Sequence, residues 1–201
     1  IREISHVLMT HSHPDHISGA PKLLKSTDVS IVAHHKDTKK HRNGEPFLSY
    51  MGIFGMLKLP VPFLELTPVD VLIEVDGQLP LPIDIEAIHT PGHTPGSVCY
   101  LMKNNGVLFS GDTLFSNGTG LSRSLPLPGS SRTDYQGSVQ KLATLEFDVL
   151  CGGHGKPLVG NASSTLRKFV AQRPDPPTWG EFLTTIPQRI ARGGNSCFKG
   201  P

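Results

Sequence analysis

The chain has 201 residues, enough for one domain with a sizeable core, and 37% of them are apolar. Charged residues contribute only 18% and the formal net charge is +2, which excludes a disordered chain and a strongly basic nucleic-acid binder. No stretch approaches the roughly 20 apolar residues of a membrane span, so we expect neither a nucleic-acid nor a membrane partner. Three widely separated cysteines favour reduced thiols and a cytoplasmic location.

Residues 4–9 have the apolar, β-branched pattern of a buried strand, although the chain opens on isoleucine rather than methionine. We therefore expect the natural N-terminal part of the domain to be missing from this sequence. Apolar segments then alternate with amphipathic ones, which predicts layered α/β packing. The predicted strands are residues 29–33, 69–75, 83–89, 97–102, 107–110 and 148–151, and the predicted helices are residues 17–24, 134–145 and 162–171.

Two signals fix details of these elements. An Asn104-Asn105-Gly106 sequence predicts a hairpin turn between the strands at 97–102 and 107–110. Asp134 stands where an N-cap residue would start the following helix. We expect one domain over residues 1–172 and a tail over 173–201 that is rich in Pro and Gly and holds at most one short helix.

The segment 45–68 is apolar, rich in Pro and Gly, and without a single period. Three interpretations remain open for it. It is a loop with a short helix that caps the core, a lid or wall for an apolar substrate, or a dimer contact.

Ligand-type residues are concentrated directly after the first predicted strand. His11, His13, Asp15 and His16 fall within six positions of one loop. His11 and His13 project to the same side of an extended chain, and Pro14 restricts the bend that turns Asp15 and His16 in another direction. Imidazole together with carboxylate suits zinc, iron, manganese or cobalt, so the loop could serve two adjacent metal positions.

Three further loops follow predicted strands and carry one ligand-type residue each. His93 lies in Thr-Pro-Gly-His-Thr-Pro-Gly, Asp112 lies in Ser-Gly-Asp-Thr, and His154 lies in Gly-Gly-His-Gly. Glycine and proline make such loops tight and leave room for close approach. The remaining histidines, and Cys151 at the end of a buried strand, are interpreted as surface or packing residues.

This series of motifs resembles the metallo-β-lactamase superfamily of metal-dependent hydrolases. The resemblance implies an α/β fold, a four-layer αββα sandwich, which would here be N-terminally incomplete. It also implies two divalent metal ions, zinc above all and iron or manganese otherwise. One ion would bind His11, His13 and His93, the other would bind Asp15, His16 and His154, and Asp112 would bridge both.

The implied activity is hydrolysis of a small-molecule acyl ester, thioester or lactone by a hydroxide between the metals, with Asp15 also orienting that hydroxide. The sequence Gly-Asp-Thr-Leu-Phe at 111–115 and the segment that starts Asp134-Tyr135 resemble the glyoxalase II-like branch, which includes hydroxyacylglutathione hydrolase. Tyr135 is predicted to donate a hydrogen bond to the substrate. Two alternatives stay open, an iron-dependent oxidoreductase of the persulfide dioxygenase type and an inactive metal-binding fragment.

Overall fold

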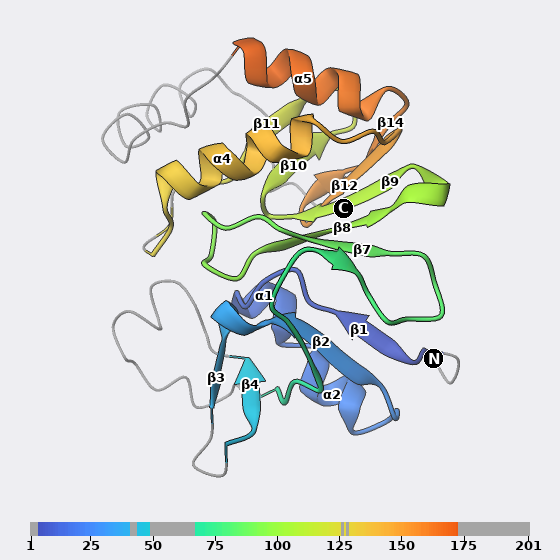
Figure 1. Cartoon of the computed structure of the whole chain (residues 1–201), viewed down its shortest axis with the longest axis vertical. Coiled ribbons are helices and arrows are strands. Elements are labelled where there is room, and N and C mark those ends of the chain that lie inside the picture. The colour runs from blue at the N-terminus through green and yellow to red at the C-terminus, as the bar shows by residue number, and fades with distance from the viewer. Residues whose placement is uncertain (1–3, 41–43, 49–66, 126, 128, 173–201) are drawn as a thin grey trace.

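The structure is a computed structural model of the chain, and it describes residues 4–40, 44–48, 67–125, 127 and 129–172. Figure 1 shows helices α4 and α5 at one end of the molecule and α1 and α2 toward the other, with the strands between them. Their bounds are α1 Pro14–Ile17, α2 Ala20–Leu24, α4 Arg132–Ala143 and α5 Ala162–Gln172.

The larger sheet has six strands in the order β14-β12-β9-β8-β7-β6. β9 and β12 are parallel neighbours, whereas β7, β8 and β9 form an antiparallel meander. The C-terminal ends of β9 and β12 therefore meet at one edge of the sheet. The strands are β6 Gly77–Gln78, β7 Glu86–His89, β8 Val98–Met102, β9 Val107–Gly111, β12 Val149–Gly152 and β14 Leu158–Val159.

A second sheet contains three parallel strands in the order β1-β2-β5, which are β1 His6–Leu8, β2 Ser30–His34 and β5 Val71–Ile73. α1 and α2 connect β1 to β2, as a crossover between parallel strands requires. The short 3-10 helix η1, His35–Asp37, follows β2 directly.

Three separate hydrophobic clusters lie between these layers. In β2, Ile31 packs in the cluster with α1 and α2, whereas its neighbour Val32 packs in the cluster between the two sheets. In β8, Tyr100 faces the second sheet and Leu101 faces the cluster formed with α4 and α5. Because successive side chains of a strand point to opposite faces, both sheets are buried on both sides. Three interfaces define four layers, and the αββα sandwich expected from the resemblance is confirmed.

Several short strands lie outside the predicted set. They are the edge strands β6 and β14 of the larger sheet, β3 Thr38–Lys40 with β4 Pro46–Leu48, and a small sheet of β10 Leu114–Asn117, β11 Leu121–Arg123 and β13 Gly155–Lys156. Each has two to four residues, too few to show a period in the sequence. The prediction for segment 45–68 falls mostly on residues 49–66, and the predicted tail on residues 173–201, which lie outside the described residues.

Three details of the predicted elements differ from the structure. The single helix predicted over residues 17–24 is two short helices, α1 and α2, because Pro21 has no N–H to donate to the carbonyl of Ile17. α4 begins at Arg132 rather than Asp134, and the side chain of Ser131 caps it by accepting a hydrogen bond from the backbone N–H of Asp134 at 3.3 Å. The prediction of Asp134 as the cap is therefore wrong, since serine caps a helix as well as aspartate does. The predicted hairpin between β8 and β9 is confirmed, but its turn is the 3-10 helix η2, Lys103–Asn105, closed by Gly106 at φ +62°.

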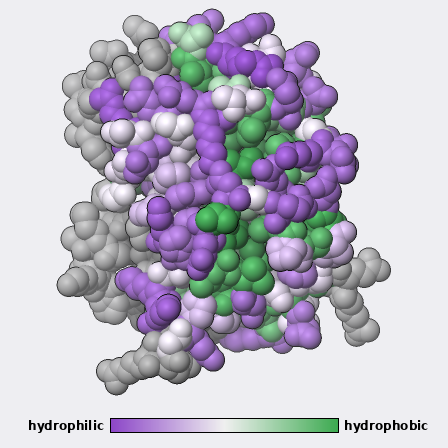
Figure 2. Space-filling view, in the orientation of Figure 1, coloured by the Kyte–Doolittle hydropathy of each residue, from purple (hydrophilic) through white to green (hydrophobic). Residues whose placement is uncertain are grey.

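The surface in the view of Figure 1 is mainly polar. Figure 2 shows hydrophobic side chains reaching this face in a discontinuous band along its centre, over the strands, with polar side chains on both sides. Among the described residues, no helix combines the length and the apolar character that crossing a bilayer requires.

Candidate metal centre

The loop after β1 points its side chains in two directions. His13 is the N-cap of α1, and Pro14 occupies the first turn, where its missing N–H costs no hydrogen bond. The backbone N–H of His16 donates to the carbonyl of His13 at 3.0 Å, so a single turn of helix reverses the chain. His11 and His13 are buried, whereas Asp15 and His16 are carried round on the helix.

The other three ligand-type residues come from strand ends of the larger sheet. His93 lies between β7 and β8, Asp112 directly follows β9, and His154 follows β12. Gly153 lets the loop of His154 approach Asp112 and His16, because a Cβ at this position would lie 2.3 Å from Asp112 Oδ1 and 2.7 Å from His16 Cε1. A larger residue would therefore displace Asp112 or His16.

All seven residues predicted as metal ligands lie together in the structure, and we call them the ligand cluster. They form groups whose ligand atoms all lie within 4.8 Å of one another. The groups are His11 with His13 and His93, Asp15 with His16 and His154, and His11 with His16 and Asp112. The first two groups coincide with the two ligand sets that the resemblance implied, and the third joins them through Asp112.

Asp112 lies in the middle of the ligand cluster. Its Oδ2 is 3.6 Å from His93 Nε2, 3.5 Å from His154 Nε2 and 4.0 Å from His11 Nε2. Its Oδ1 is 3.3 Å from His16 Nε2. One carboxylate therefore faces imidazoles of both ligand sets.

Burial and crowding keep most of these imidazoles neutral. Burial lowers the pKa of His11 well below its ordinary value, and the neighbouring imidazoles lower it further. Burial, followed by the proximity of His13, lowers the pKa of His93 to about 4. A neutral imidazole keeps the lone pair with which it binds a cation. His16 differs, because the adjacent Asp112 and Asp15 carboxylates outweigh its burial and raise its pKa.

Three buried polar atoms of the ligand cluster make no hydrogen bond of acceptable geometry with the described residues. They are His11 Nε2, His16 Nε2 and Asp112 Oδ1. Buried polar atoms without a partner are costly, and cations bound to the two ligand sets would give all three atoms a partner. The donor set of imidazole and carboxylate fits zinc, iron or manganese.

Neighbouring hydroxyl groups orient two of the ligand imidazoles. Ser124 Oγ lies 2.6 Å from His93 Nδ1, and Thr10 Oγ1 lies 3.1 Å from His11 Nδ1. Both imidazoles therefore turn Nε2 toward Asp112. Such partners fix the tautomer and the direction of a metal-binding histidine. Neither Ser124 nor Thr10 is predicted from the sequence, because a lone hydroxyl residue next to a loop carries no signal of its own.

Tyr135 lies at the start of α4 with its side chain buried. Its hydroxyl donates to the carbonyl of Thr113 and accepts from the backbone N–H of Ser124 at 3.0 Å. These contacts connect the residue after Asp112 with the residue that holds His93. A hydrogen bond from Tyr135 to the substrate stays a prediction.

A second group of histidines lies apart from the ligand cluster. The rings of His34 and His89 stack with centroids 3.9 Å apart and an angle of 6° between their planes, and His35 packs on His34. Stacked rings do not direct their nitrogens to one point, and these residues form no metal-binding group among the described residues. His89 Nε2 donates a hydrogen bond to the carbonyl of Pro95 at 2.9 Å and so supports the loop that carries His93. His41 lies outside the described residues.

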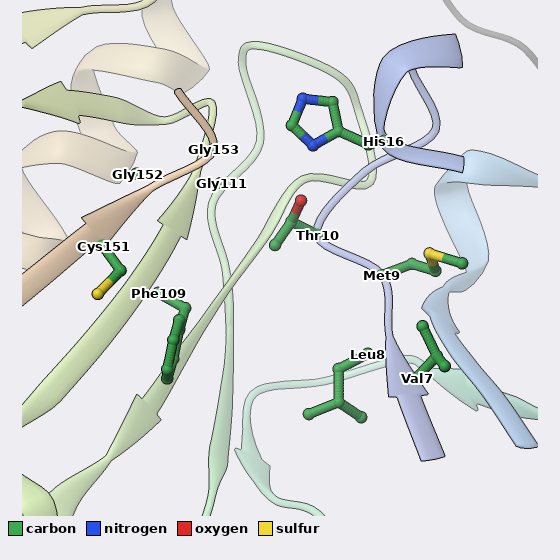
Figure 3. A pocket seen from close by; sticks show the side chains of 10 residues that line it. All are labelled: Val7, Leu8, Met9, Thr10, His16, Phe109, Gly111, Cys151, Gly152 and Gly153. Carbon is green, nitrogen blue, oxygen red and sulfur yellow. The ribbon is translucent and has the colours of Figure 1, made fainter. Parts of the chain in front are cut away.

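A cavity of about 260 Å³ reaches the ligand cluster from between the sheets. Figure 3 shows His16 at one end, Leu8 of β1 and the following Met9 on one side, and Phe109 and Cys151 on the other. The walls are mostly apolar. Cys151 faces this cavity and belongs to none of the metal-binding groups of the described residues, in agreement with its interpretation as a packing residue.

One residue beside the ligand cluster is not predicted from the sequence at all. Asp37 ends η1 and is almost fully buried, with 1% of its surface exposed. A carboxylate three residues after a buried strand was the available signal, whereas Asp112 follows its strand directly. It was obscured because Asp37 shares its segment with two histidines and a lysine.

The chain matches one protein-family model and is similar in sequence to known proteins. Residues 1–154, which include the whole ligand cluster, match the family model of the metallo-beta-lactamase superfamily. A probable metallo-hydrolase of Bacillus subtilis strain 168, YqgX, is 34% identical over 151 residues, which are 74% of this chain and 67% of that protein. A hydroxyacylglutathione hydrolase of Xylella fastidiosa strain M23 is 31% identical over 153 residues, covering 74% of this chain but only 45% of that protein.

The fold also matches a solved structure. The crystal structure of BLEG-1, a B3 metallo-beta-lactamase, superposes with a TM-score of 0.63 at 25% sequence identity. The match covers 83% of this chain and 74% of that chain.

Proposed function

Because the chain belongs to the metallo-beta-lactamase superfamily, we propose that it is a hydrolase with two metal ions that cleaves an acyl ester, thioester or lactone. The convergence of the ligand cluster carries this proposal. Three loops far apart in the sequence bring two trios of ligand atoms around one carboxylate, Asp112, which comes from a fourth loop. Ion pairs with Asp112 would not explain the arrangement, because the lowered pKa values of His11 and His93 leave these imidazoles uncharged at neutral pH.

In the proposed site, His11, His13 and His93 hold one ion, Asp15, His16 and His154 hold the other, and Asp112 binds both. We propose zinc for both positions, with iron or manganese as the ions that the same donors accept. When bound, such a pair of ions supplies the Lewis acidity that activates water at neutral pH and polarises a carbonyl group.

The chain's own residues set the polarity of this site. Asp112 contributes negative charge between the two positions, which offsets the repulsion between two cations. The side chain of Asp15 is 56% exposed and its Oδ2 lies 3.1 Å from His154 Nε2. Asp15 is therefore the carboxylate of the ligand cluster that solvent and substrate reach most easily, and we assign it the second role of orienting the attacking water.

Two observations support an acyl substrate. The Xylella fastidiosa relative is named a hydroxyacylglutathione hydrolase, although the alignment spans less than half of that protein. Asp112 is in place between the ligand sets, and the resemblance to the glyoxalase II-like branch depends on this residue.

The test is metal content in matched histidine variants. We expect the purified parent to hold two metal ions per chain by elemental analysis, and His93→Ala to lose at least one of them. His6→Ala serves as the control, because His6 lies in β1 away from the ligand cluster and its side chain hydrogen-bonds to the neighbouring Ser5 at 2.9 Å. Equal metal content in His93→Ala and His6→Ala would refute the ligand assignment.

Metal stoichiometry also separates the proposal from the oxidoreductase alternative. Two ions per chain together with hydrolysis of an ester, thioester or lactone panel support the proposal. A single iron per chain with oxygen consumption on a persulfide would instead assign the chain to the dioxygenase type. Ligand chemistry alone does not separate the two, because histidine and aspartate bind zinc and iron alike.

A further inference from the structure

A buried carboxylate that belongs to no metal-binding group joins two of the ligand loops. Asp37 Oδ2 accepts hydrogen bonds from the backbone N–H of Ser12 at 2.9 Å and from Thr94 Oγ1 at 2.8 Å. Its Oδ1 accepts one from the backbone N–H of Gly96 at 2.7 Å. Ser12 lies between His11 and His13, and Thr94 follows His93.

From these contacts we infer that Asp37 is a positioning residue of the metal centre, which holds the loop of His13 and the loop of His93 at the separation where both bind the same ion. The inference rests on the proposed function. His13 Nδ1 and His93 Nε2 are 2.8 Å apart, although 80 residues separate them in the sequence. Asp37, from a third segment, contacts the backbone or side chain next to each of them.

The chemistry of the contact requires a carboxylate at this position. Two oxygens without hydrogens accept all three bonds, whereas the amide of asparagine would turn a donor toward at least one N–H or O–H. Space is equally restricted, because a Cβ on Gly96 would lie 2.6 Å from the carboxylate of Asp37. The contact therefore requires aspartate at position 37 and glycine at position 96.

The negative charge of Asp37 favours metal binding, as its hydrogen bonds to the two ligand loops do. Burial raises the pKa of Asp37, while the bonds from Thr94, Gly96 and Ser12 oppose that rise. Its negative charge also favours positive charge at His13. A cation held by His13 gains from this charge, so the buried carboxylate favours metal binding without being a ligand.

Asp37 is not needed merely to join the two sheets. The stack of His34 on His89 and the bond from Tyr100 to the carbonyl of Met9 at 2.7 Å connect the same layers elsewhere. Removing the Asp37 carboxylate should therefore change the positions of the ligand loops more than the packing of the two sheets.

The test compares Asp37→Asn with Asp70→Asn in the full chain as purified. Asp70 is a matched control, because its Oδ2 also accepts a backbone N–H, that of Ile31 at 2.7 Å, in the same half of the molecule but away from the ligand cluster. Metal affinity is measured by competition with a chelator, and the exchange of the Ser12 and Gly96 amide hydrogens is followed by NMR.

We expect Asp37→Asn to weaken the affinity for at least one ion by about tenfold or more, as loss of supporting partners of metal ligands does. The Ser12 and Gly96 amides should exchange faster in this variant, and Asp70→Asn should change neither quantity. Thr94→Val removes one bond and leaves the carboxylate, so we expect a smaller loss in the same direction, and little further loss when it is combined with Asp37→Asn.

Parental metal affinity in Asp37→Asn, or an equal loss in Asp70→Asn, would overturn the inference. If Asp37→Asn does not fold, Thr94→Val takes its place as the test. Parental metal affinity together with a parental exchange rate of the Gly96 amide in Thr94→Val would then overturn the inference. A parent that binds no metal would refute the proposed function instead, and the amide exchange would still show whether Asp37 holds the two loops.

Discussion

Asp112 owes its central position to the contact between β9 and β12. It is the first residue after β9, and the loop after β12 brings Gly153 and His154 beside it. Burial alone would raise the pKa of this carboxylate, but the imidazoles around it, with His16 foremost at 3.3 Å, lower it. Asp112 is therefore ionised at neutral pH, as a bridge between cations needs to be.

Replacing Asp112 by asparagine tests its role directly. Asp112→Asn keeps the size of the side chain and one acceptor oxygen but removes the negative charge between the two ligand sets. We expect at most one tightly held ion, and a loss of kcat on the order of 10² or more, the scale seen when a principal electrostatic group is removed. Elemental analysis and kcat on any ester or lactone that the parent hydrolyses measure both effects.

Asp84→Asn is the matched control for this substitution. Asp84 accepts a hydrogen bond from Asn104 at the surface, so its loss removes one charge without touching the ligand cluster. We expect parental metal content and kcat in that variant. Two ions per chain and near-parental kcat in Asp112→Asn would show that Asp112 is not the bridge.

At the scale of single elements, the start of α4 matters most to the site. Ser131 caps this helix, and its backbone N–H donates to the carbonyl of Gly92 at 2.8 Å, next to His93. One turn later Tyr135 packs against the same glycine, where a Cβ would lie 2.3 Å from the Tyr135 backbone. The helix start thus fixes the backbone that presents His93.

The cap predicts a difference between two neighbouring substitutions. Ser131→Ala removes the oxygen that accepts the Asp134 N–H, and we expect it to lower the free energy of unfolding by about 1 kcal/mol. Asp134→Ala removes only a charge in the first helical turn, so its cost should be smaller. Urea unfolding of both variants beside the parent measures the difference. A larger cost for Asp134→Ala would identify Asp134 as the effective cap.

At the scale of the whole molecule, the two halves meet along the second histidine group as well as at the ligand cluster. His34 ends β2 in one sheet, and His89 ends β7 in the other. Burial lowers the pKa of His34 to about 3, and the neighbouring His89, His35 and Lys36 add to the shift. His34 is therefore neutral in the folded protein above about pH 3.

This pKa makes stability depend on pH in one direction. The unfolded chain binds a proton at His34 below about pH 6.5, but the folded chain does so only near pH 3. Above about pH 6.5 His34 is neutral in both the folded and the unfolded chain, so it does not make the free energy of unfolding depend on pH. As the pH falls from 6.5 toward 3, protonation favours the unfolded chain, and His34 should lower stability by about 1.4 kcal/mol per pH unit.

His34→Phe isolates this contribution. The ring can still stack on His89 but cannot take up a proton, and the acceptor for the Lys36 N–H is lost. At pH 7.5 we expect the variant to be less stable than the parent by about 1 kcal/mol. Its disadvantage should shrink and then reverse as the pH falls to 5, in urea unfolding of both proteins with chelator present. A difference that stays constant with pH would contradict the neutral state of His34.

The sequence determined the chemistry of the ligand cluster and the type of most longer elements. Ligand-type residues in four loops, each after an apolar segment, were enough to predict the residues that the structure brings together, because the strands before these loops belong to two sheets packed against each other. Alternation and helical spacing predicted β8, β9, β12 and α5 within a residue or two.

Only the tertiary structure decided what holds those ligands in place. Ser124 reaches His93, and Asp37 ties Ser12 to Gly96, through contacts between segments 25 to 59 residues apart. No local pattern marks such residues, since a serine or an aspartate at a strand end has many uses. The four-layer order was likewise decided by which face of each strand meets which neighbour, because periodicity indicates that a face is buried but not what it is buried against.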